Sequence, residues 1–533
     1  MKKHILVGLM SLVPAAMLAQ SAIDAYNLSP AELRGTARFM SMGGAFTALG
    51  GDLSTLTQNP AGIGVYRSSE IGVTLDIDIQ STETSSQGYK RSSDQTKVAC
   101  NNFGYVGAVA LNNDVMPFFT WGAAYQRSAS FDRVFSGGVP QLSTSMSNYI
   151  ANYTSGQNWA YPVDLLDDYS SSYNPYIDSG ADWLSILAYN GYMINPTHRG
   201  SNEYTGLWQN GTNGDAVFKT RQKGYVDEYA INFGGNIMNT VYWGIGFGVT
   251  DLDFRSDTYY DEQLSDALIP NASATGTVTG DAAFSIENWQ HTTGTGFNFK
   301  AGLIYKPINE FRLGIAVHTP TYYDMTTVYD ARVDYGYSSG IYSDQQPNHP
   351  SQTVVADYNW QMKSPWRLMI GAAGVFGGRG ILSVDYERTA YSDMKVQDDA
   401  GNTYDDVTDD IKNYFQASNS IRLGAEYRAT PSFSLRVGFN YTTSDVKDEA
   451  ADNQEQIYTS GTNPSYVLKK DTYHVTCGLG YRYKGFYADA AYVYRHREST
   501  WHGFTPFEGH TDTPQASLTE NDSHIVLSVG YRF

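Results

Sequence analysis

The last nine residues of the chain alternate strictly between apolar side chains and small or polar ones. One face consists of Ile525, Leu527, Val529, Tyr531 and Phe533, and the other of Val526, Ser528, Gly530 and Arg532. A two-residue period of this kind is typical of a transmembrane β-strand, because lipid lies on one side of it and a polar lumen on the other. The end of the chain therefore predicts a β-barrel.

The same alternation recurs along the whole chain, so the prediction does not depend on one strand. Alternating segments lie at 68–79, 102–111, 117–130, 226–238, 241–256, 294–306, 310–325, 352–376, 379–392, 418–428, 432–445, 470–484, 486–497 and 522–533. They number fourteen if 352–376 is one strand with an internal Pro365, and single-chain outer-membrane barrels have an even number of strands. The predicted fold is all-β: a transmembrane antiparallel barrel of about fourteen strands.

The lengths of the connections give independent support for a barrel. Short turns are predicted at 112–116, 239–240, 307–310, 377–378, 429–431 and 484–485. Long loops are predicted near 80–101, 131–225, 257–293, 326–351, 393–417, 446–469 and 498–521. Strict alternation of short and long connections is the asymmetry between periplasmic turns and extracellular loops. Both ends of the barrel are then periplasmic, and 68–533 is predicted to be the barrel domain.

The N-terminus has the pattern of an export signal. Two lysines precede an apolar stretch from Ile5 to Met17, and Ala19 supplies a small residue at the cut. This predicts a signal peptide over 1–19. The stretch is too short to span a bilayer, and no later apolar run is long enough. If the mature protein lies in lipid, it is a closed barrel in the outer membrane of a Gram-negative bacterium.

Composition narrows the possible partners. The chain has 42 Tyr, 51 Gly and only 17% charged residues, which suits strands, turns and aromatic girdles. A net charge of -19 argues against nucleic acid as a partner. Cys100 and Cys477 do not form a disulfide framework, and Cys477 is expected to face lipid. The acidic loop residues are interpreted as a solvated exterior, with a cation site as the alternative.

The lumen face carries charges of both signs. These are Lys300, Arg312, Arg367, Asp385, Glu387, Arg422, Glu426, Arg436, Arg482, Asp489, Arg495 and Arg532. Buried charges of mixed sign favour pairing with one another or with a plug. A wide, water-filled porin would also carry them, so the lumen face alone leaves both architectures open.

The segment 33–64, before the first strand, favours the plug. It is too apolar for a free tail, and its many Gly and Ala residues let a chain fold compactly against barrel walls. Asn59-Pro60 marks a turn, since Pro fixes its own φ and Asn makes local turn bonds. Residues 20–67 are therefore predicted to form a compact hatch in the lumen.

The hatch also resembles a known family. The runs Gly43–Phe46, Asp52–Thr55 and Asn59–Gly62 are similar to the N-terminal hatch of the FadL/TodX family. The motif residues are Gly43, Gly44, Asp52, Asn59, Pro60, Ala61 and Gly62. The resemblance implies a monomeric, plugged, fourteen-stranded outer-membrane barrel that takes up long-chain fatty acids or aromatic hydrocarbons passively. It implies no catalytic residue, no cofactor and no metal, and in some members the solute leaves sideways into the bilayer.

The implied partners are hydrophobic small molecules or fatty acids, outer-membrane lipid with lipopolysaccharide, and the barrel-assembly machinery, whose recognition signal the terminal Phe533 resembles. Candidate ligand contacts lie in two places. Segment 181–189 is apolar and helix-compatible, with Trp183, Leu184 and Leu187 as contacts or as packing of the barrel roof. In the hatch, Phe39, Met42, Phe46 and Leu49 either line a pocket or pack against the wall.

Other classes remain as alternatives. An outer-membrane enzyme would need a nucleophile beside a histidine at the rim, and no spacing marks one near His474, His496, His502, His510 or His524. A haem receptor could use His or Tyr ligands, but no paired His motif supports it. A surface structural or adhesive barrel using the acidic loops is the third alternative.

Overall fold

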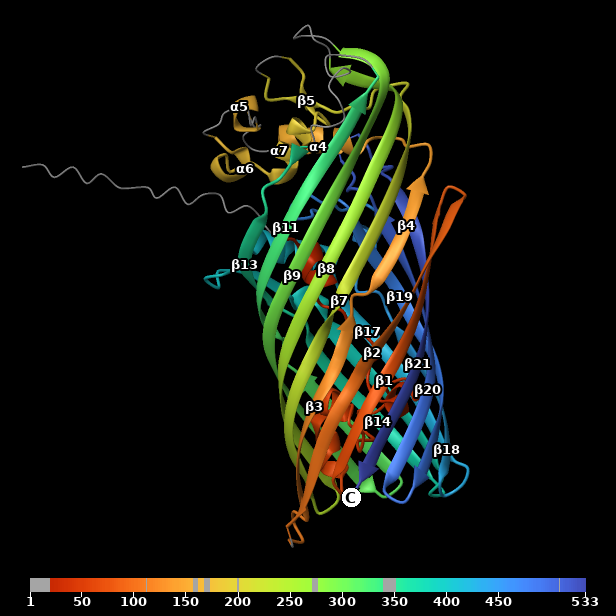
Figure 1. Cartoon of the computed structure of the whole chain (residues 1–533). Coiled ribbons are helices and arrows are strands. Elements are labelled where there is room, and N and C mark those ends of the chain that lie inside the picture. The colour runs from red at the N-terminus through yellow and green to blue at the C-terminus, as the bar shows by residue number, and fades with distance from the viewer. Residues whose placement is uncertain are drawn as a thin grey trace, which may run out of the picture.

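The computed structural model describes residues 20–111, 113–156, 162–166, 173–198, 201–270, 277–338, 351–507 and 509–533. Within these ranges, fourteen antiparallel strands close into a barrel, because the first strand pairs with both the second and the last (Figure 1). The predicted fold class is confirmed. The predicted signal peptide, 1–19, lies outside the described residues.

Three of the fourteen wall strands are each divided into two named parts. In order around the barrel, the wall consists of β1 (Glu70–Ser86), β2 (Tyr89–Ala110), β3 (Phe118–Ser130) with β4 (Arg133–Val139), β7 (Asn213–Ile237), β8 (Val241–Pro270), β9 (Thr277–Ile308), β10 (Phe311–His318) with β11 (Tyr322–Tyr337), β13 (Ala356–Lys363) with β14 (Trp366–Phe376), β15 (Gly380–Ala390), β17 (Ala417–Arg428), β18 (Phe433–Thr442), β19 (Tyr466–Tyr483), β20 (Phe486–His502) and β21 (Gln515–Arg532). Two short strands, β12 (Ser351–Gln352) and β16 (Lys395–Asp398), extend the sheet, and β5 (Asn195–Pro196) pairs with β6 (Tyr204–Thr205) outside it.

Helices lie inside the barrel and above it. The hatch contains α1 (Ala22–Asn27), α2 (Ala37–Ser41), α3 (Thr55–Gln58) and the 3₁₀ helix η1 (Pro60–Val65). The extracellular connections contain α4 (Met146–Gly156), α5 (Val163–Leu166), α6 (Pro175–Asp178), α7 (Trp183–Asn190), η2 (Tyr391–Asp393), α8 (Asp405–Tyr414) and α9 (Asp448–Ala451). No helix in the described ranges is both long and apolar enough to cross a membrane.

The alternating faces are as predicted. Ile525, Leu527 and Val529 are 40–54% exposed on the outer surface, whereas Val526 and Ser528 between them are buried. The backbone of the terminal Phe533 pairs with that of Ser69 through two hydrogen bonds of 3.0 Å, which ties the end of β21 to the start of β1. Exposed aromatic side chains flank the short turns, among them Tyr305, Phe311, Tyr427, Tyr483 and Phe486. They form a belt at the periplasmic interface.

Two of the predicted long loops are wrong. Segment 80–101 continues β1 and β2 as a long hairpin that turns at Gln87 and Gly88, both with positive φ. Much of 257–293 likewise continues β8 and β9, with 271–276 outside the described residues. The reason is physical. Above the lipid the outward face becomes polar, so the apolar period disappears while the ladder of backbone hydrogen bonds continues.

The prediction of one bent strand over 352–376 is confirmed in its essentials. β13 and β14 follow each other around Ser364 and Pro365, and both pair with the β10–β11 side of the wall. A second break of the same kind separates β10 from β11 at Pro320. Proline donates no backbone hydrogen bond to a ladder, so each strand bends and resumes beyond it.

Candidate functional site

The lumen near the periplasmic end of the barrel is filled by the hatch. Phe46, Met42 and Met40 are fully buried, and Arg38 lies over the ring of Phe46 at 5.2 Å. Gly43 and Gly44 both have positive φ, which L-residues with a β-carbon rarely adopt. The small residues of the motif therefore allow the hatch to turn tightly against the wall.

Asn59 joins two parts of the hatch. Its Nδ2 donates to the carbonyl of Thr47 at 2.6 Å, and its Oδ1 accepts from the backbone N–H of Ala61 at 3.0 Å. The side chain is fully buried, and Pro60 occupies the first position of η1, where its missing N–H costs nothing. Asp52 acts similarly nearby, accepting from Thr36 Oγ1 at 2.7 Å. The polar residues of the motif hold the hatch in one conformation.

Glycines of the wall provide the seat for this turn. A β-carbon at Gly302 would overlap Asn59 Oδ1, and one at Gly244 would overlap the carbonyl of Pro60. One at Gly314 would overlap the carbonyl of Thr47. These glycines lie on three successive strands, β8, β9 and β10. The sequence shows them as inward members of alternating strands, but their role as a seat follows only from the structure.

Ion pairs connect the hatch to the wall on several sides. Arg34 contacts Asp76 at 2.8 Å and Asp78 at 3.3 Å, and Arg38 contacts Glu426 at 2.9 Å. Further links are Glu32–Arg495, the donation of Thr47 N to Asp385, the donation of Arg312 to the Leu49 carbonyl, and a hydrogen bond between His318 and the Gln58 carbonyl. The predicted mixed lumen charges thus pair with the plug and with one another, as in Arg436–Glu426 and Arg367–Glu387.

The first helix of the hatch, α1, lies on its extracellular side, and the sequence analysis did not predict it as a helix. Ser21 and Asp24 form a reciprocal capping box at its start. Tyr26 stacks on Phe415 with ring centroids 4.5 Å apart, and its hydroxyl donates to Asp445 at 2.9 Å. The spacing of Ser21 and Asp24 was the available signal. This helix closes the lumen beneath α8.

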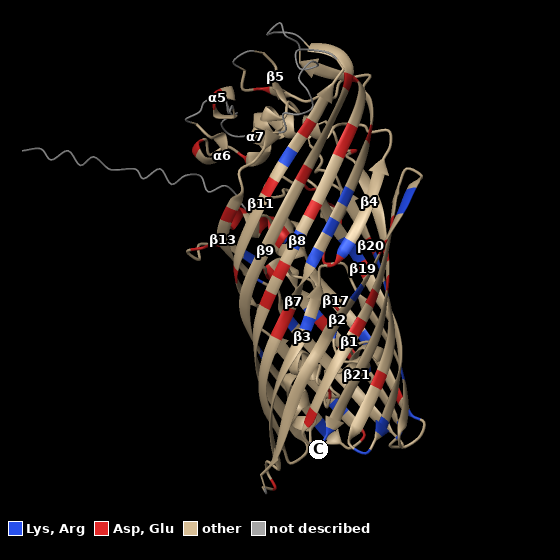
Figure 2. Ribbon diagram, viewed as in Figure 1, with Lys and Arg blue, Asp and Glu red and all other residues tan. Residues whose placement is uncertain are grey.

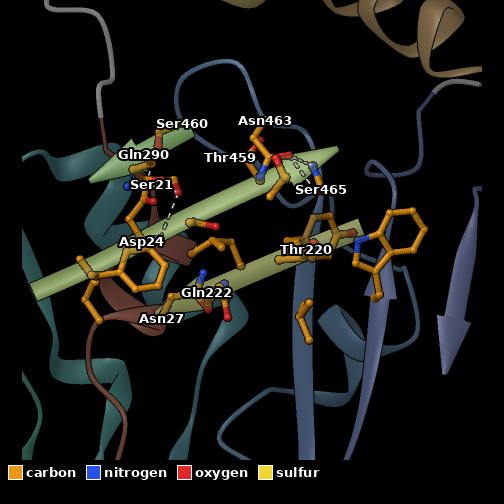
Figure 3. A pocket seen from close by; sticks show the side chains of 18 of the residues that line it. Ser21, Asp24, Asn27, Thr220, Gln222, Gln290, Thr459, Ser460, Asn463 and Ser465 are labelled. Carbon is orange, nitrogen blue, oxygen red and sulfur yellow. Dashed lines mark hydrogen bonds between the residues drawn. The ribbon is translucent and has the colours of Figure 1, made fainter. Parts of the chain in front are cut away.

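Two small cavities border α1 and the chain that follows it. The upper one, about 80 Å³, is lined by Asp24, Thr220, Gln222 and other polar residues (Figure 3). Trp501 and Phe135 also line it. The lower one, about 100 Å³, surrounds Leu28–Ala31 and reaches Ser128 on β3. Leu28 lines both. Neither holds a molecule of 300 Å³ or about that size, the usual lower bound for ligand pockets.

Beside the lower cavity, the wall has a seam that strand pairing does not close, although an ion pair between Lys97 and Asp132 at 3.3 Å spans it. β2 pairs with β3 only from Asn102 to Ala110, and the register of β3 against β7 shifts between Arg127 and Ala129. Beyond the shift, β4 continues to pair with β7, but in the described ranges no ladder joins it to β2. Val98 on the free edge of β2 is 69% exposed and lies opposite the outward Ile77. The seam therefore begins at the height of the lipid.

The hatch residues proposed as ligand contacts are packed. Phe39 and Phe46 lie with ring centroids 5.4 Å apart, and Met42 and Leu49 belong to the same buried cluster. The residues that line the two cavities do not include them. Their contact with a ligand remains a prediction.

The proposed outer contacts lie in the predicted helix, which the structure places at Trp183–Asn190 as α7. Trp183 and Leu184 are more than nine-tenths buried, and Leu187 is fully buried. Trp183 Nε1 donates to the carbonyl of Tyr176 at 3.0 Å, and its ring lies against Tyr329. The helix forms part of the barrel roof, and ligand contact at these residues also remains a prediction.

The rim histidines do not form one site. His524 lies in the lumen with its Nδ1 at 3.1 Å from Asp76, whereas His496 bonds Asn521. His502 stacks on Tyr466 with centroids 4.7 Å apart, and His510 stacks on Phe507. Among the described residues, no three His, Cys, Asp or Glu side chains gather as metal ligands would.

A closed barrel with outward apolar strands and a lumen filled by its own N-terminal segment defines a plugged outer-membrane transport barrel. The family of outer membrane transport proteins described as OMPP1/FadL/TodX matches residues 215–529. The chain belongs to this family, which comprises transport channels. The matched region begins in β7 and does not include the hatch.

One solved structure supports the assignment of the fold. A FadL homologue from Pseudomonas aeruginosa has a TM-score of 0.52 at 13% identity, covering 95% of this chain and 100% of its own. The toluene transporter TodX of Pseudomonas putida has a TM-score of 0.49 at 14% identity, with 94% and 99% covered. The toluene transporter TbuX of Ralstonia pickettii has a TM-score of 0.45 at 14% identity, with 95% and 100% covered. No curated protein sequence matches the chain.

Proposed function

We propose that this barrel takes up hydrophobic solutes, such as long-chain fatty acids or aromatic hydrocarbons, passively and as a monomer. Family membership supports transport of hydrophobic compounds. The filled lumen supports a route that depends on binding, because a lumen crossed by ion pairs and a packed hatch is not a wide water channel. Burial of apolar surface, at ~25 cal/mol per Å², would supply the affinity that a water-filled pore lacks.

The seam beside the lower cavity is the observation on which the route rests. A solute captured at the extracellular end would pass α1, enter the region of the lower cavity and leave between β2 and β3 into the bilayer. Both cavities border Leu28, so a shift of the segment after α1 would join them. Ser128 lies at the register shift and lines the lower cavity. The proposed exit and the inner cavity thus share Ser128.

Deletion of Ser128 tests this route. Removing the extra residue would restore the register of β3 and extend its pairing with β2, as expected for the removal of a bulge. Uptake of a labelled fatty acid should fall at least tenfold while the barrel still assembles, as shown by heat-modifiable migration on gels.

Deletion of Asp266 is the matched control, because it removes a residue at another register shift, far along β8. That variant should transport normally. Normal uptake by the Ser128 deletion, at normal surface abundance, would contradict lateral exit and leave release through the hatch as the route.

A further inference from the structure

The segment that joins α1 to α2, residues 28–36, lies directly behind the lower end of the seam, and both edges of the seam hold its backbone. Asn101 on β2 donates its side-chain amide to the carbonyl of Gly35 at 3.4 Å. Gln126 on β3 donates to the carbonyl of Arg34 at 3.1 Å. Gln126 also belongs to the last paired position of β2 and β3, opposite Asn102. This linker therefore bridges the two strands at the point where their pairing ends.

Ion pairs fix the linker to the β1–β2 side of the seam. Arg34 contacts Asp76 at 2.8 Å and Asp78 at 3.3 Å, and both carboxylates lie on β1, which pairs with β2. Figure 2 shows charged residues of both signs on the wall strands at this height. Arg34 is only 4% exposed, and Asp76 is fully buried. Separation of a buried pair leaves unpaired charges behind, so this attachment is firm.

The side chain of Glu32 attaches the linker to β3, above the last paired position. Its carboxylate accepts from the backbone N–H of Ser130 at 3.2 Å. The next N–H, that of Phe131, donates to the carbonyl of Gly224 on β7 at 3.0 Å. Successive backbone donors of a strand point to opposite neighbours, so the N–H of Ser130 points to the side that faces β2. Glu32 thus takes the place of a strand partner that β2 does not supply in the described ranges.

The surroundings of Glu32 show that this attachment is separable from the rest of the lumen. Glu32 pairs with Arg34 at 3.0 Å and with Arg495 at 3.1 Å. Arg34 also pairs with β1, and Arg495 also pairs with Asp522, so neither arginine depends on Glu32 alone. The other link across the seam is the pair Lys97–Asp132, whose lysine is 42% exposed. Exposed ion pairs contribute little, so this link alone holds the edges weakly.

We propose that the linker is a strap that holds the seam closed in the resting barrel, with Glu32 as its releasable attachment to β3. The inference rests on the proposed function, because it assigns control of the exit that the lateral route requires. Ala31 lines the lower cavity, so a solute that fills this cavity presses on the residue next to Glu32. Displacement of the linker withdraws Glu32 from Ser130 and lets the edge of β3 move away from β2. Glu32 is therefore a positioning residue that acts on the wall.

The test measures the width of the seam in nanodiscs without solute. Spin labels are attached at Thr96→Cys on β2 and Val134→Cys on β4, in a full-length barrel that carries Cys100→Ser and Cys477→Ser, and their distance is measured by double electron–electron resonance. Glu32→Ala should shift the distance distribution to longer values by about 5 Å, the spacing of neighbouring strands, because the strap no longer holds β3.

A second variant removes the same hydrogen bond from the other partner. Ser130→Pro deletes the donated N–H at an unpaired edge, where proline is tolerated, and should give the same shift. Glu426→Gln is the matched control, because it weakens the ion pair of the hatch with the wall at Arg38, on β17 and away from the seam. That variant should leave the distance between the labels unchanged.

An unchanged distance in both Glu32→Ala and Ser130→Pro would overturn the strap. An equal shift in Glu426→Gln would also overturn it, because loosening of the whole hatch would then open the seam. Uptake of a labelled fatty acid by Glu32→Ala should rise, because the exit no longer waits for release of the strap. An opened seam with unaltered uptake would support the strap and contradict lateral exit, so the two proposals fail separately.

Discussion

At the scale of single residues, the hatch is held by close approach as much as by hydrogen bonds. Gly302 lies so near Asn59 that a β-carbon would overlap the amide oxygen. The same Asn59 bonds Thr47 and Ala61, so a displacement there disturbs two segments of the hatch. A wall glycine therefore controls the position of a plug residue that is distant in sequence.

Replacement of Gly302 by alanine should loosen the hatch without preventing barrel assembly. The added methyl group costs about 1–3 kcal/mol through overpacking, and the hatch bears that cost because the strand ladder is intact. Protease cleavage within 33–64 should become faster, and ion leakage should rise. Gly336→Ala on β11 is the control, because a β-carbon there meets nothing within 4 Å. Equal protease resistance of the two variants would contradict the role of Gly302 in seating the hatch.

At the scale of elements, α8 carries one carboxyl group, that of Asp410, whose negative charge destabilises the helix and whose ionisation depends on pH. The pKa of Asp410 is raised to about 6 by partial burial and by the neighbouring carboxylates Asp406, Asp409 and Glu455. A carboxyl group whose pKa is higher in the folded state than in the unfolded one favours folding when protonated. The stability of α8 should therefore fall as the pH rises from about 4 through 6.

Asp410→Asn should remove this dependence. Above pH 6 the variant should protect the amides of α8 from hydrogen exchange better than the unaltered chain, after correction for intrinsic rates, whereas at pH 4 the two should be equal. Asp405→Asn is the comparison, because Asp405 lies exposed on the first turn, where a negative charge is favourable. An identical pH profile for Asp410→Asn and the unaltered chain would show that Asp410 does not cause the pH dependence of α8.

The elements differ in how well the sequence predicts them. Within the lipid, lipid and lumen impose opposite preferences on alternate residues, so strands such as β18 and β21 are recognisable from their period alone. Beyond the lipid both faces are polar, so the upper parts of β1 and β8 carry no such period, and their sequence predicts loops. The seam at Ser128 depends on which strand pairs with which, and pairing leaves no local pattern.

The functional regions show the same limit. The motif from Gly43 to Gly62 predicts a hatch, because small residues and Asn-Pro turns have local physical consequences. The contacts that seat the hatch cannot be predicted from the sequence. Gly244 and Gly302 are distant in sequence from the hatch, and each resembles any other lumen glycine. The helix α7 was predicted correctly, yet its burial in the roof depends on loops that meet only in three dimensions.

At the scale of the whole molecule, the filled lumen predicts electrical behaviour. In planar bilayers the barrel should show little steady ion conductance, because the hatch and its ion pairs occupy the lumen. Removal of residues 20–67, if the shortened barrel assembles, should produce a stable current. A large open-channel current from the full-length protein would favour a general porin instead.

The central claim is that affinity for the solute comes from apolar burial, and a homologous series of fatty acids tests it most directly. Binding to the detergent-purified barrel should strengthen with chain length by ~0.8 kcal/mol per buried CH₂ until the pocket is full. Leu187→Asp and Phe46→Asp should weaken it if these residues contact the ligand, since an unpaired carboxylate would lie in an apolar site. Affinity that does not change with chain length would contradict uptake of hydrophobic solutes by this route.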